Sequence, residues 1–487
     1  MFSFLALLSV LGLAYAGTTT LTVPGKPPPG CATLDRAPVA LSFEFYEFPS
    51  YFTNVSNTET CMKHLHDVSG VWPRIRIGGT SQDYSTYVPS LDPYIVYSVP
   101  DPATLAKNIT FGPRFIDLAE SYPGTVVMGL NRGGDNLNNT IEAAVAIEKR
   151  MHNLQAIELG NEPDIYAALN FPLTSNSGYN LTTWTPETEA HSESTWQLAV
   201  TSPLAQPNII QAGNLEQPPS LYNASNLIKY EDPLALETVK TFSHHNYPQS
   251  TYFADSVNLE ALMKHQNIVE NVGTFKTDVE VARSVGWEYV FGETNSVSGG
   301  GSPLISPLFG TAIWLLDYVL QAATINIKRT YLHQCTIETC WYAFWDRENV
   351  NAPFYGAFVA TYVLAGGKYI SSLDDGTSNY GGYVVFDEGG KQLKLVLVNS
   401  DYYTNGTRGV ERFVIEGLKD GWVRGRRLTA ESALSKVSEG NLPTFGGRWF
   451  ESDCSIAGRE EVEVVKVEGG KAGFEIAASE ALIVDLC

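Results

Sequence analysis

The sequence is poor in basic residues and contains neither a long apolar run nor a nucleotide-binding loop, and each absence excludes a class of function. Its 32 lysines and arginines are outnumbered by 53 aspartates and glutamates, for a net charge of −21, so nucleic acids and highly sulfated glycans are poor partners. After the first residues, no stretch reaches the roughly 18 apolar residues of a membrane-spanning helix, and we expect no membrane insertion. No glycine-rich loop follows the first expected strand and no His-x-x-x-His spacing occurs, so we predict neither a cofactor nor a metal site.

The N-terminal segment predicts export. Residues 1–16 carry no charge, contain an apolar stretch and end in Ala-Tyr-Ala, the pattern of a secretory signal peptide cleaved before Gly17. We therefore expect a secreted, extracellular protein. With 487 residues, 44% of them hydrophobic, the chain is long enough for one large folded domain and a smaller one.

Cysteines and glycosylation sequons agree with this location. All six cysteines follow the signal, and an even number in a secreted chain favours disulfides over metal ligation. The expected pairs are Cys335–Cys340 within one loop, Cys454–Cys487 at the last strand and, by elimination, Cys31–Cys61. Six Asn-x-Ser/Thr sequons predict surface N-glycans, at Asn54, Asn108, Asn138, Asn180, Asn223 and Asn405.

The middle of the chain alternates short apolar runs with helix-like stretches such as 141–151 and 259–269. This alternation predicts an α/β fold, a (β/α)₈ TIM barrel, over residues 37–370. The competing interpretation is an open doubly wound sheet, which the missing phosphate loop disfavours. The eight expected strands are 39–45, 74–77, 125–130, 156–159, 209–212, 241–245, 288–291 and 329–332.

Residues 371–487 predict a second, all-β domain, because their apolar runs alternate with polar residues and are separated by Gly-Gly turns. Residues 17–36 contain a strand-like stretch near Thr20 and then a proline-rich linker. We expect that strand to join the C-terminal strands, so that the β-sandwich is built from both chain ends.

Two expected strands end in a glutamate, at Asn161-Glu162-Pro163 and at Gly292-Glu293-Thr294. In a (β/α)₈ barrel, functional side chains lie at the carboxyl ends of the strands. By the strand count, Glu162 ends strand four and Glu293 ends strand seven, so the two carboxylates face each other across the mouth. We predict a glycosidase with Glu162 as acid and base and Glu293 as nucleophile, at the roughly 5 Å separation of a retaining enzyme.

Neighbouring polar residues complete the predicted site. Asn161 is placed to bind the sugar 2-hydroxyl, and Tyr247 to donate a hydrogen bond to the nucleophile. Asp83 is interpreted as a structural partner of Arg76. Two pairs remain open: His244 and His245 either orient the nucleophile region or pack beneath it, and Trp341 and Trp345 either stack on sugar or fill the mouth.

The sequence resembles glycoside hydrolase family 79, which contains the β-glucuronidases and heparanase. The matching stretches are 76–80, 129–131, 161–163, 217–218, 244–247, 292–296 and 299–301. The resemblance implies that Glu44 and Gln217 bind the sugar, and that the amides of Gly299 and Gly300 with the hydroxyl of Tyr342 hold a glucuronate carboxylate. The chain departs from the family pattern at Ser298, where a tyrosine is frequent.

The predicted function is therefore a secreted retaining exo-β-glucuronidase that acts on glucuronate or 4-O-methylglucuronate in a glycan. One alternative is a retaining β-glycosidase or endoglycanase for neutral sugars. The other is a non-catalytic carbohydrate-binding wall protein that kept the barrel.

Overall fold

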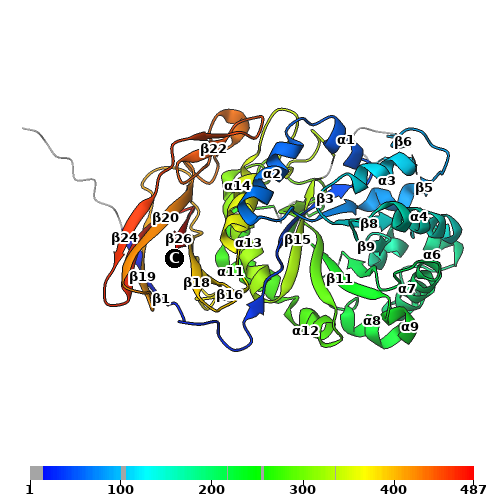
Figure 1. The fold of residues 1–487 in the computed structure, drawn as a ribbon, viewed down its shortest axis with the longest axis horizontal. Helices are drawn as coiled ribbons and strands as arrows, with labels where there is room; N and C mark the ends of the chain where they lie inside the picture. Colours follow the sequence, from blue (N-terminus) through cyan, green and yellow to red (C-terminus); the bar gives the residue numbers. More distant parts are fainter. Residues whose placement is uncertain (1–14, 100–105, 217, 254–256, 335, 487) are drawn as a thin grey trace, which may run out of the picture.

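Two domains lie side by side in the computed structural model, a (β/α)₈ barrel and a β domain (Figure 1). The structure describes residues 15–99, 106–216, 218–253, 257–334 and 336–486. The predicted signal peptide therefore lies almost wholly outside the described residues. None of the helices in the described part of the chain has the length and apolar character that crossing a membrane requires.

The barrel closes through eight parallel strands in chain order, which confirms the predicted fold. Its strands are apolar runs because they are buried on both faces, under the surrounding helices and around the barrel interior. Each coincides with one expected run. The strands are β3 (Val39–Glu44), β4 (Ile75–Gly78), β8 (Val126–Leu130), β9 (Leu154–Leu159), β10 (Ile210–Leu215), β11 (Val239–Asn246), β13 (Glu288–Thr294) and β15 (Ile327–Gln334).

Helices between the strands form the outer layer of the barrel. The longer ones are α2 (Thr58–Ser69), α3 (Pro113–Glu120), α4 (Leu137–Arg150), α7 (Pro186–Thr201), α8 (Ala224–Tyr230), α12 (Lys276–Ser284), α13 (Phe309–Thr324) and α14 (Ala352–Leu364). The helix expected over 259–269 is two helices, α10 (Leu259–Met263) and α11 (His265–Gly273), because the backbone at Lys264 leaves the helical region with ψ 118°.

Three strands that the sequence analysis did not predict interrupt the barrel between β4 and α3. They are β5 (Ser85–Tyr87), β6 (Ile95–Ser98) and β7 (Lys107–Phe111), which form a small sheet in the order β5-β7-β6.

The β domain is a sandwich that uses both ends of the chain, as predicted. A three-stranded sheet pairs β1 (Tyr15–Thr22) with β19 (Val410–Glu416) and β25 (Lys471–Ala477). The facing sheet contains β2 (Ala32–Thr33), β16 (Tyr369–Ser372), β17 (Tyr380–Phe386), β18 (Gln392–Asn399), β26 (Glu480–Asp485) and β20 (Gly421–Thr429). Buried apolar side chains such as Leu21, Val384, Phe413 and Phe474 fill the space between them.

The disulfide pattern differs from the prediction. Cys61 in α2 is bonded to Cys454 in the β domain, across 393 residues of sequence, so the expected pairs Cys31–Cys61 and Cys454–Cys487 are wrong. Cys31 keeps a free thiol, and Cys340 is disulfide-bonded, whereas Cys335 and Cys487 lie outside the described residues. The spacing of the cysteines in the sequence could not predict the Cys61–Cys454 bond, because this bond depends on how the β domain packs against α2.

Candidate active site

Glu162 is held at the mouth of the barrel by an unusual backbone conformation. After β9 ends, Gly160 has φ +77° and Glu162 itself has φ +55°, a region that a side chain larger than glycine seldom adopts. The Glu162 N–H donates to the carbonyl of Asn214, at 2.9 Å. Pro163 then begins a short 3₁₀ turn. This geometry turns the Glu162 carboxyl toward the barrel axis.

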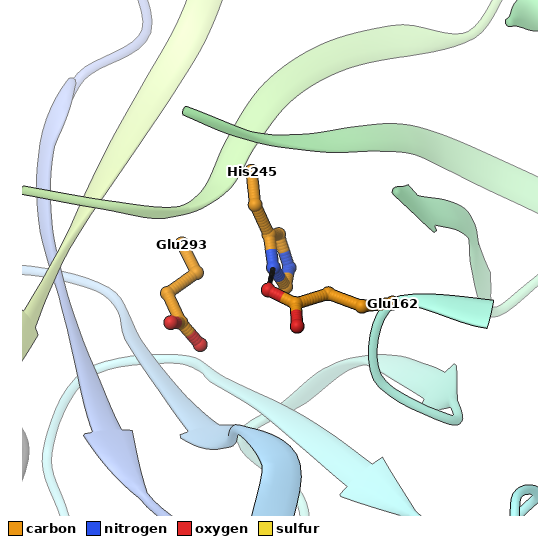
Figure 2. A group of neighbouring side chains, drawn as sticks. All are labelled: Glu162, His245 and Glu293. Atoms are coloured by element: carbon orange, nitrogen blue, oxygen red, sulfur yellow. Dashed lines mark hydrogen bonds and ion pairs between the residues drawn. The ribbon is translucent and has the colours of Figure 1, made fainter. Parts of the chain in front are cut away.

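Glu293 lies in β13, and its side chain extends toward Glu162 (Figure 2). Oxygen atoms of the two carboxyls and a ring nitrogen of His245 all lie within 4.8 Å of one another. The two glutamate side chains are only 15% and 10% exposed. The structure thus brings the two predicted carboxyls together in a largely enclosed space.

Three neighbours surround the Glu293 carboxylate. Arg76 and the Tyr247 hydroxyl each donate to it at 2.6 Å, and His333 Nδ1 lies 3.8 Å away. Burial by itself would raise the pKa of Glu293, but the charges of His333 and Arg76, with the hydrogen bond from Tyr247, outweigh it and hold the pKa well below its usual value. Glu293 is therefore ionised and available as a nucleophile.

Glu162 has the opposite environment. Its Oε1 lies 2.9 Å from His245 Nδ1, and burial lowers the pKa of His245 to about 4, so the imidazole is neutral. Burial, reinforced by the negative charge of Glu293, raises the pKa of Glu162 to about 8. Glu162 therefore carries a proton at neutral pH, as a general acid requires.

Arg76 is fully buried and links both halves of the site. Besides Glu293 it donates to Glu158, at 2.9 and 2.5 Å, and to Asn161 Oδ1, at 2.9 Å. The last bond fixes the amide of Asn161 so that its NH₂ group is left to donate elsewhere.

Asp83 is not a partner of Arg76, and that interpretation was wrong. Its carboxylate accepts the backbone N–H of Asn161 at 2.8 Å and the hydroxyl of Tyr166 at 2.7 Å. It also accepts the N–H groups of Arg132 and Gly133. Asp83 therefore holds the loop before Glu162, while Glu158, a charged residue inside a buried strand, balances Arg76.

Glu44 lies at the end of β3. Its carboxylate accepts the backbone N–H of Ser81 at 3.0 Å and lies 3.3 Å from His333 Nε2. Burial lowers the pKa of His333, yet the charges of Glu293 and Glu44 on either side give it a net rise. His333 follows the eighth expected strand, 329–332, directly. Its position between two acids could not be predicted without knowledge of which strands are neighbours.

The glycine turn packs against the loop that carries Tyr342. Gly299 and Gly300 have φ +73° and +84°, and the Gly300 carbonyl accepts the Trp341 N–H at 2.8 Å. The buried ring of Tyr342 lies 6.2 Å from the rings of both Tyr247 and His333. Burial raises the pKa of Tyr342 well above its usual value, so it remains a neutral donor. Gln217 lies outside the described residues.

The structure shows where the residues of the two open pairs lie. Alternation along β11 points His245 into the site and His244 outward, where its Nδ1 lies 2.7 Å from the Tyr289 hydroxyl. Trp345 is fully buried and donates to Thr58, so it fills the core. Trp341 is 44% exposed at the surface.

By distance alone, Glu162, His245 and Glu293 could hold a metal ion, and they are the one such group in the described part of the chain. The Glu293 oxygens, however, already accept hydrogen bonds from Arg76 and Tyr247. A guanidinium at this distance occupies the position that a cation would take, which favours acid–base chemistry over metal binding.

A barrel with two opposed carboxyls at the ends of its fourth and seventh strands defines a glycoside hydrolase. Residues 382–483 match the model of the glycosyl hydrolase family 79 C-terminal beta domain. A crystal structure of a 4-O-α-L-rhamnosyl-β-D-glucuronidase from Fusarium oxysporum is 40% identical, with a TM-score of 0.91 over 96% of this chain and 100% of that one. The chain belongs to glycoside hydrolase family 79.

Curated relatives agree with this family. A β-glucuronidase from Aspergillus niger is 28% identical over 385 residues, which cover 71% of this chain and 69% of the relative. A family 51 α-L-arabinofuranosidase from Bifidobacterium longum, 12% identical with a TM-score of 0.63 over 96% of this chain and 99% of that one, shares the fold alone.

Proposed function

We propose that the chain is a retaining exo-β-glucuronidase that releases glucuronate from a glycan. The observation that carries the proposal is the Glu162–Glu293 pair, whose carboxyl oxygens lie within 4.8 Å. Retaining enzymes separate the two carboxyls by about 5 Å, whereas inverting enzymes need about 6.5 to 9.5 Å to admit a water molecule.

The mechanism has two steps. In the first, the Glu293 carboxylate attacks the anomeric carbon while Glu162 gives its proton to the glycosidic oxygen, and the aglycone leaves as an alcohol. The resulting ester removes the negative charge of Glu293, so the pKa of Glu162 falls. In the second step, Glu162 takes a proton from water, the hydroxide attacks the anomeric carbon, and Glu293 is released.

Glucuronate is the sugar that the pocket and the relatives favour. The Aspergillus niger relative is named a β-glucuronidase and the Fusarium oxysporum relative a 4-O-rhamnosyl-β-glucuronidase. In this chain Tyr342 lies close enough to Glu293 to feel its charge, and the amides of Gly299 and Gly300 are suited to a single carboxylate, because amides in a glycine turn can approach an anion closely. Glu44 and Asn161 are assigned to the sugar hydroxyls.

A second candidate is a glucuronidase for 4-O-substituted glucuronate. Sequence identity favours this candidate, because the chain is 40% identical to the 4-O-rhamnosyl-glucuronidase and 28% identical to the β-glucuronidase from Aspergillus niger. 4-O-methylglucuronate is one member of this class of substituted sugars.

We also propose secretion with N-glycans. Five of the six sequon asparagines, at positions 54, 108, 138, 180 and 405, are exposed. Asn223 instead caps α8 by accepting the Asn226 N–H, at 2.9 Å, and is the poorest acceptor. Mass spectrometry of the secreted protein before and after glycosidase treatment tests this assignment.

Hydrolysis of matched chromogenic substrates tests the function. The proposal expects cleavage of the β-glucuronide at least about a hundredfold faster, in kcat/KM, than of the β-glucoside. Preference for the glucoside would favour a neutral-sugar enzyme, and no cleavage of either would favour a wall-binding protein. A third substrate, the 4-O-rhamnosyl glucuronide, decides between the two glucuronidase candidates.

A further inference from the structure

The outer helix α7 buries a row of polar side chains on one face. Residues at every fourth position of a helix lie above one another, and a helix that covers a barrel usually turns apolar residues toward the strands. Burial of a polar group costs free energy unless the group is hydrogen-bonded, so the partners of this row indicate its role. The buried row consists of Glu189, Glu193, Gln197 and Thr201.

Glu193 reaches the backbone of β10 at the point where this strand separates from β9. The pairing of the two strands covers Ile210 and Gln211 and ends there. Two residues further on, the Gly213 N–H donates to Glu193 Oε1 at 3.2 Å. Gln197 donates to the same oxygen at 3.1 Å and so fixes the carboxyl. A side chain of the outer helix, and not β9, therefore receives this N–H.

The next residue of β10 holds the catalytic acid. Asn214 has φ +53°, and the register between β10 and β11 shifts at this position. A bulge of this kind turns the backbone away from its usual direction. The Asn214 carbonyl accepts the Glu162 N–H at 2.9 Å. Because Glu162 itself has φ +55°, a conformation that the surroundings must enforce, this contact helps to fix the acid.

The same helix supports the residue before the acid. Glu189 pairs with Arg132 at 2.8 Å, and the Arg132 backbone N–H donates to Asp83 at 2.9 Å. Asp83 in turn accepts the N–H of Asn161 at 2.8 Å. The backbone N–H groups of Asn161 and Glu162 are thus each held by a group that α7 supports.

We propose that Glu193 is a positioning residue for the catalytic acid, which it orients through the bulge at Gly213 and Asn214. The inference rests on the proposed function, since it takes Glu162 as the proton donor to the leaving group. A general acid must lie within hydrogen-bond reach of the atom that it protonates. A shift of its backbone should therefore slow substrates whose leaving group needs a proton and spare those whose leaving group does not.

Two glucuronides that differ only in the leaving group test this role, one releasing methanol and one releasing 2,4-dinitrophenol. Glu193→Met keeps a side chain of similar length without an acceptor for the Gly213 N–H. It should lower kcat/KM for the methyl glucuronide about tenfold or more and change that for the dinitrophenyl glucuronide less than about twofold. Glu193→Gln, whose amide oxygen still accepts the N–H, should keep both values within about twofold of wild type. Glu187→Met, at an exposed position of the same helix, is the matched control and should change neither.

A second pair of variants tests the bulge itself. Alanine adopts the left-handed conformation at a cost in free energy, whereas glycine adopts it freely. Asn214→Ala should therefore show the selective loss on the methyl glucuronide, and Asn214→Gly should keep the wild-type ratio of the two rates.

The ratio of the two rates separates positioning from stability, because a poorly folded variant loses active enzyme equally for both substrates. Equal losses on both substrates in Glu193→Met and Asn214→Ala, or no loss in either variant, would overturn the positioning role. The ratio is measured on whichever β-glycosides the enzyme cleaves. A preference for glucosides would thus reject the proposed function and still test how Glu162 is positioned.

Discussion

The two catalytic carboxyls differ in protonation because their neighbours differ. Arg76 and Tyr247 both donate to Glu293 at 2.6 Å, whereas the partner of the Glu162 carboxyl among the described residues is the neutral His245. A pair of acids whose surroundings move their pKa values apart is the arrangement that assigns acid and nucleophile.

Replacement of each acid should give a different defect. Glu293→Gln should lower turnover by a thousandfold or more, and should not be labelled by a 2-fluoro glucuronide, because an amide cannot form the glycosyl ester. Glu162→Ala should keep much of its activity on substrates with acidic leaving groups and gain activity with azide. The measurement is kcat/KM against leaving-group pKa, and identical slopes for the two variants would reverse or reject the roles.

The pH profile should follow the acid. Glu162 must be protonated to act, and its pKa is raised to about 8, so kcat/KM should be level through the weakly acidic and neutral range and fall as pH rises through about 8. Glu293, whose pKa is lowered, should not limit the reaction until strongly acidic pH. An activity that increases between pH 7 and pH 9 would contradict this assignment.

Tyr342 tests the carboxylate pocket. A neutral donor to a desolvated anion contributes about 1.5 to 3 kcal/mol, so Tyr342→Phe should lower kcat/KM for the glucuronide about ten- to a hundredfold. The matched β-glucoside, which lacks the carboxylate, should change little. An equal loss on both sugars would show that Tyr342 supports Tyr247 or the fold, and Ser298 would be the next candidate donor.

Among the elements, α7 carries a group of buried acids behind the site. Gln197 donates to Glu193 and Glu231, at 3.1 Å each, and the remaining oxygen of each carboxyl is buried without a described partner. Arg132 pairs with Glu189 at 2.8 Å. Burial and the charge of Glu189 raise the pKa of Glu193 to about 7.

This group should make the fold more stable in acid. Below the usual carboxyl pKa, folded and unfolded chains both bind the proton. Between the usual carboxyl pKa and about 7, the folded chain keeps the proton and the unfolded chain releases it. The free energy of unfolding therefore falls as pH rises through this range. Glu193→Gln should therefore raise Tm relative to wild type near pH 7.5, by the equivalent of about 3 kcal/mol at most, and much less at pH 4.5.

Thermal unfolding at the two pH values measures this effect. Glu187→Gln, on the exposed side of the same helix, is the control. It should leave the difference in Tm between the two pH values the same as in the wild type. A Glu193→Gln variant that is destabilised equally at both pH values would contradict the prediction, because it would show that the titration of this carboxyl does not change the stability of the fold.

Strand-level prediction succeeded where burial alone determines the sequence pattern. The eight barrel strands could be counted because each contains a short, largely buried run with apolar residues. Glu162 and Glu293 could be predicted because they lie at the ends of two of these runs. The small sheet of β5, β6 and β7 was missed because β6 is largely exposed and carries no barrel-like run. The partners of Arg76, and the place of His333 between two acids, depend on which strands are neighbours.

At the scale of the whole molecule, buried polar contacts join the two domains. His265 in α11 lies 2.8 Å from Asp317 of α13 and 2.9 Å from Asp374 of the β domain. These two carboxylates raise the pKa of His265 to about 10, against the effect of burial. With the Cys61–Cys454 disulfide, this fixes the β domain against the barrel. Neither link could be predicted from the sequence, since each joins residues far apart in the chain.

The anomeric configuration of the first product tests the central claim most directly. Proton NMR during the first minutes of hydrolysis of a β-glucuronide should show the β-anomer of glucuronate, followed by slow mutarotation, because two displacements at C1 restore the starting configuration. Initial release of the α-anomer would mean that water attacks directly. It would contradict Glu293 as a covalent nucleophile.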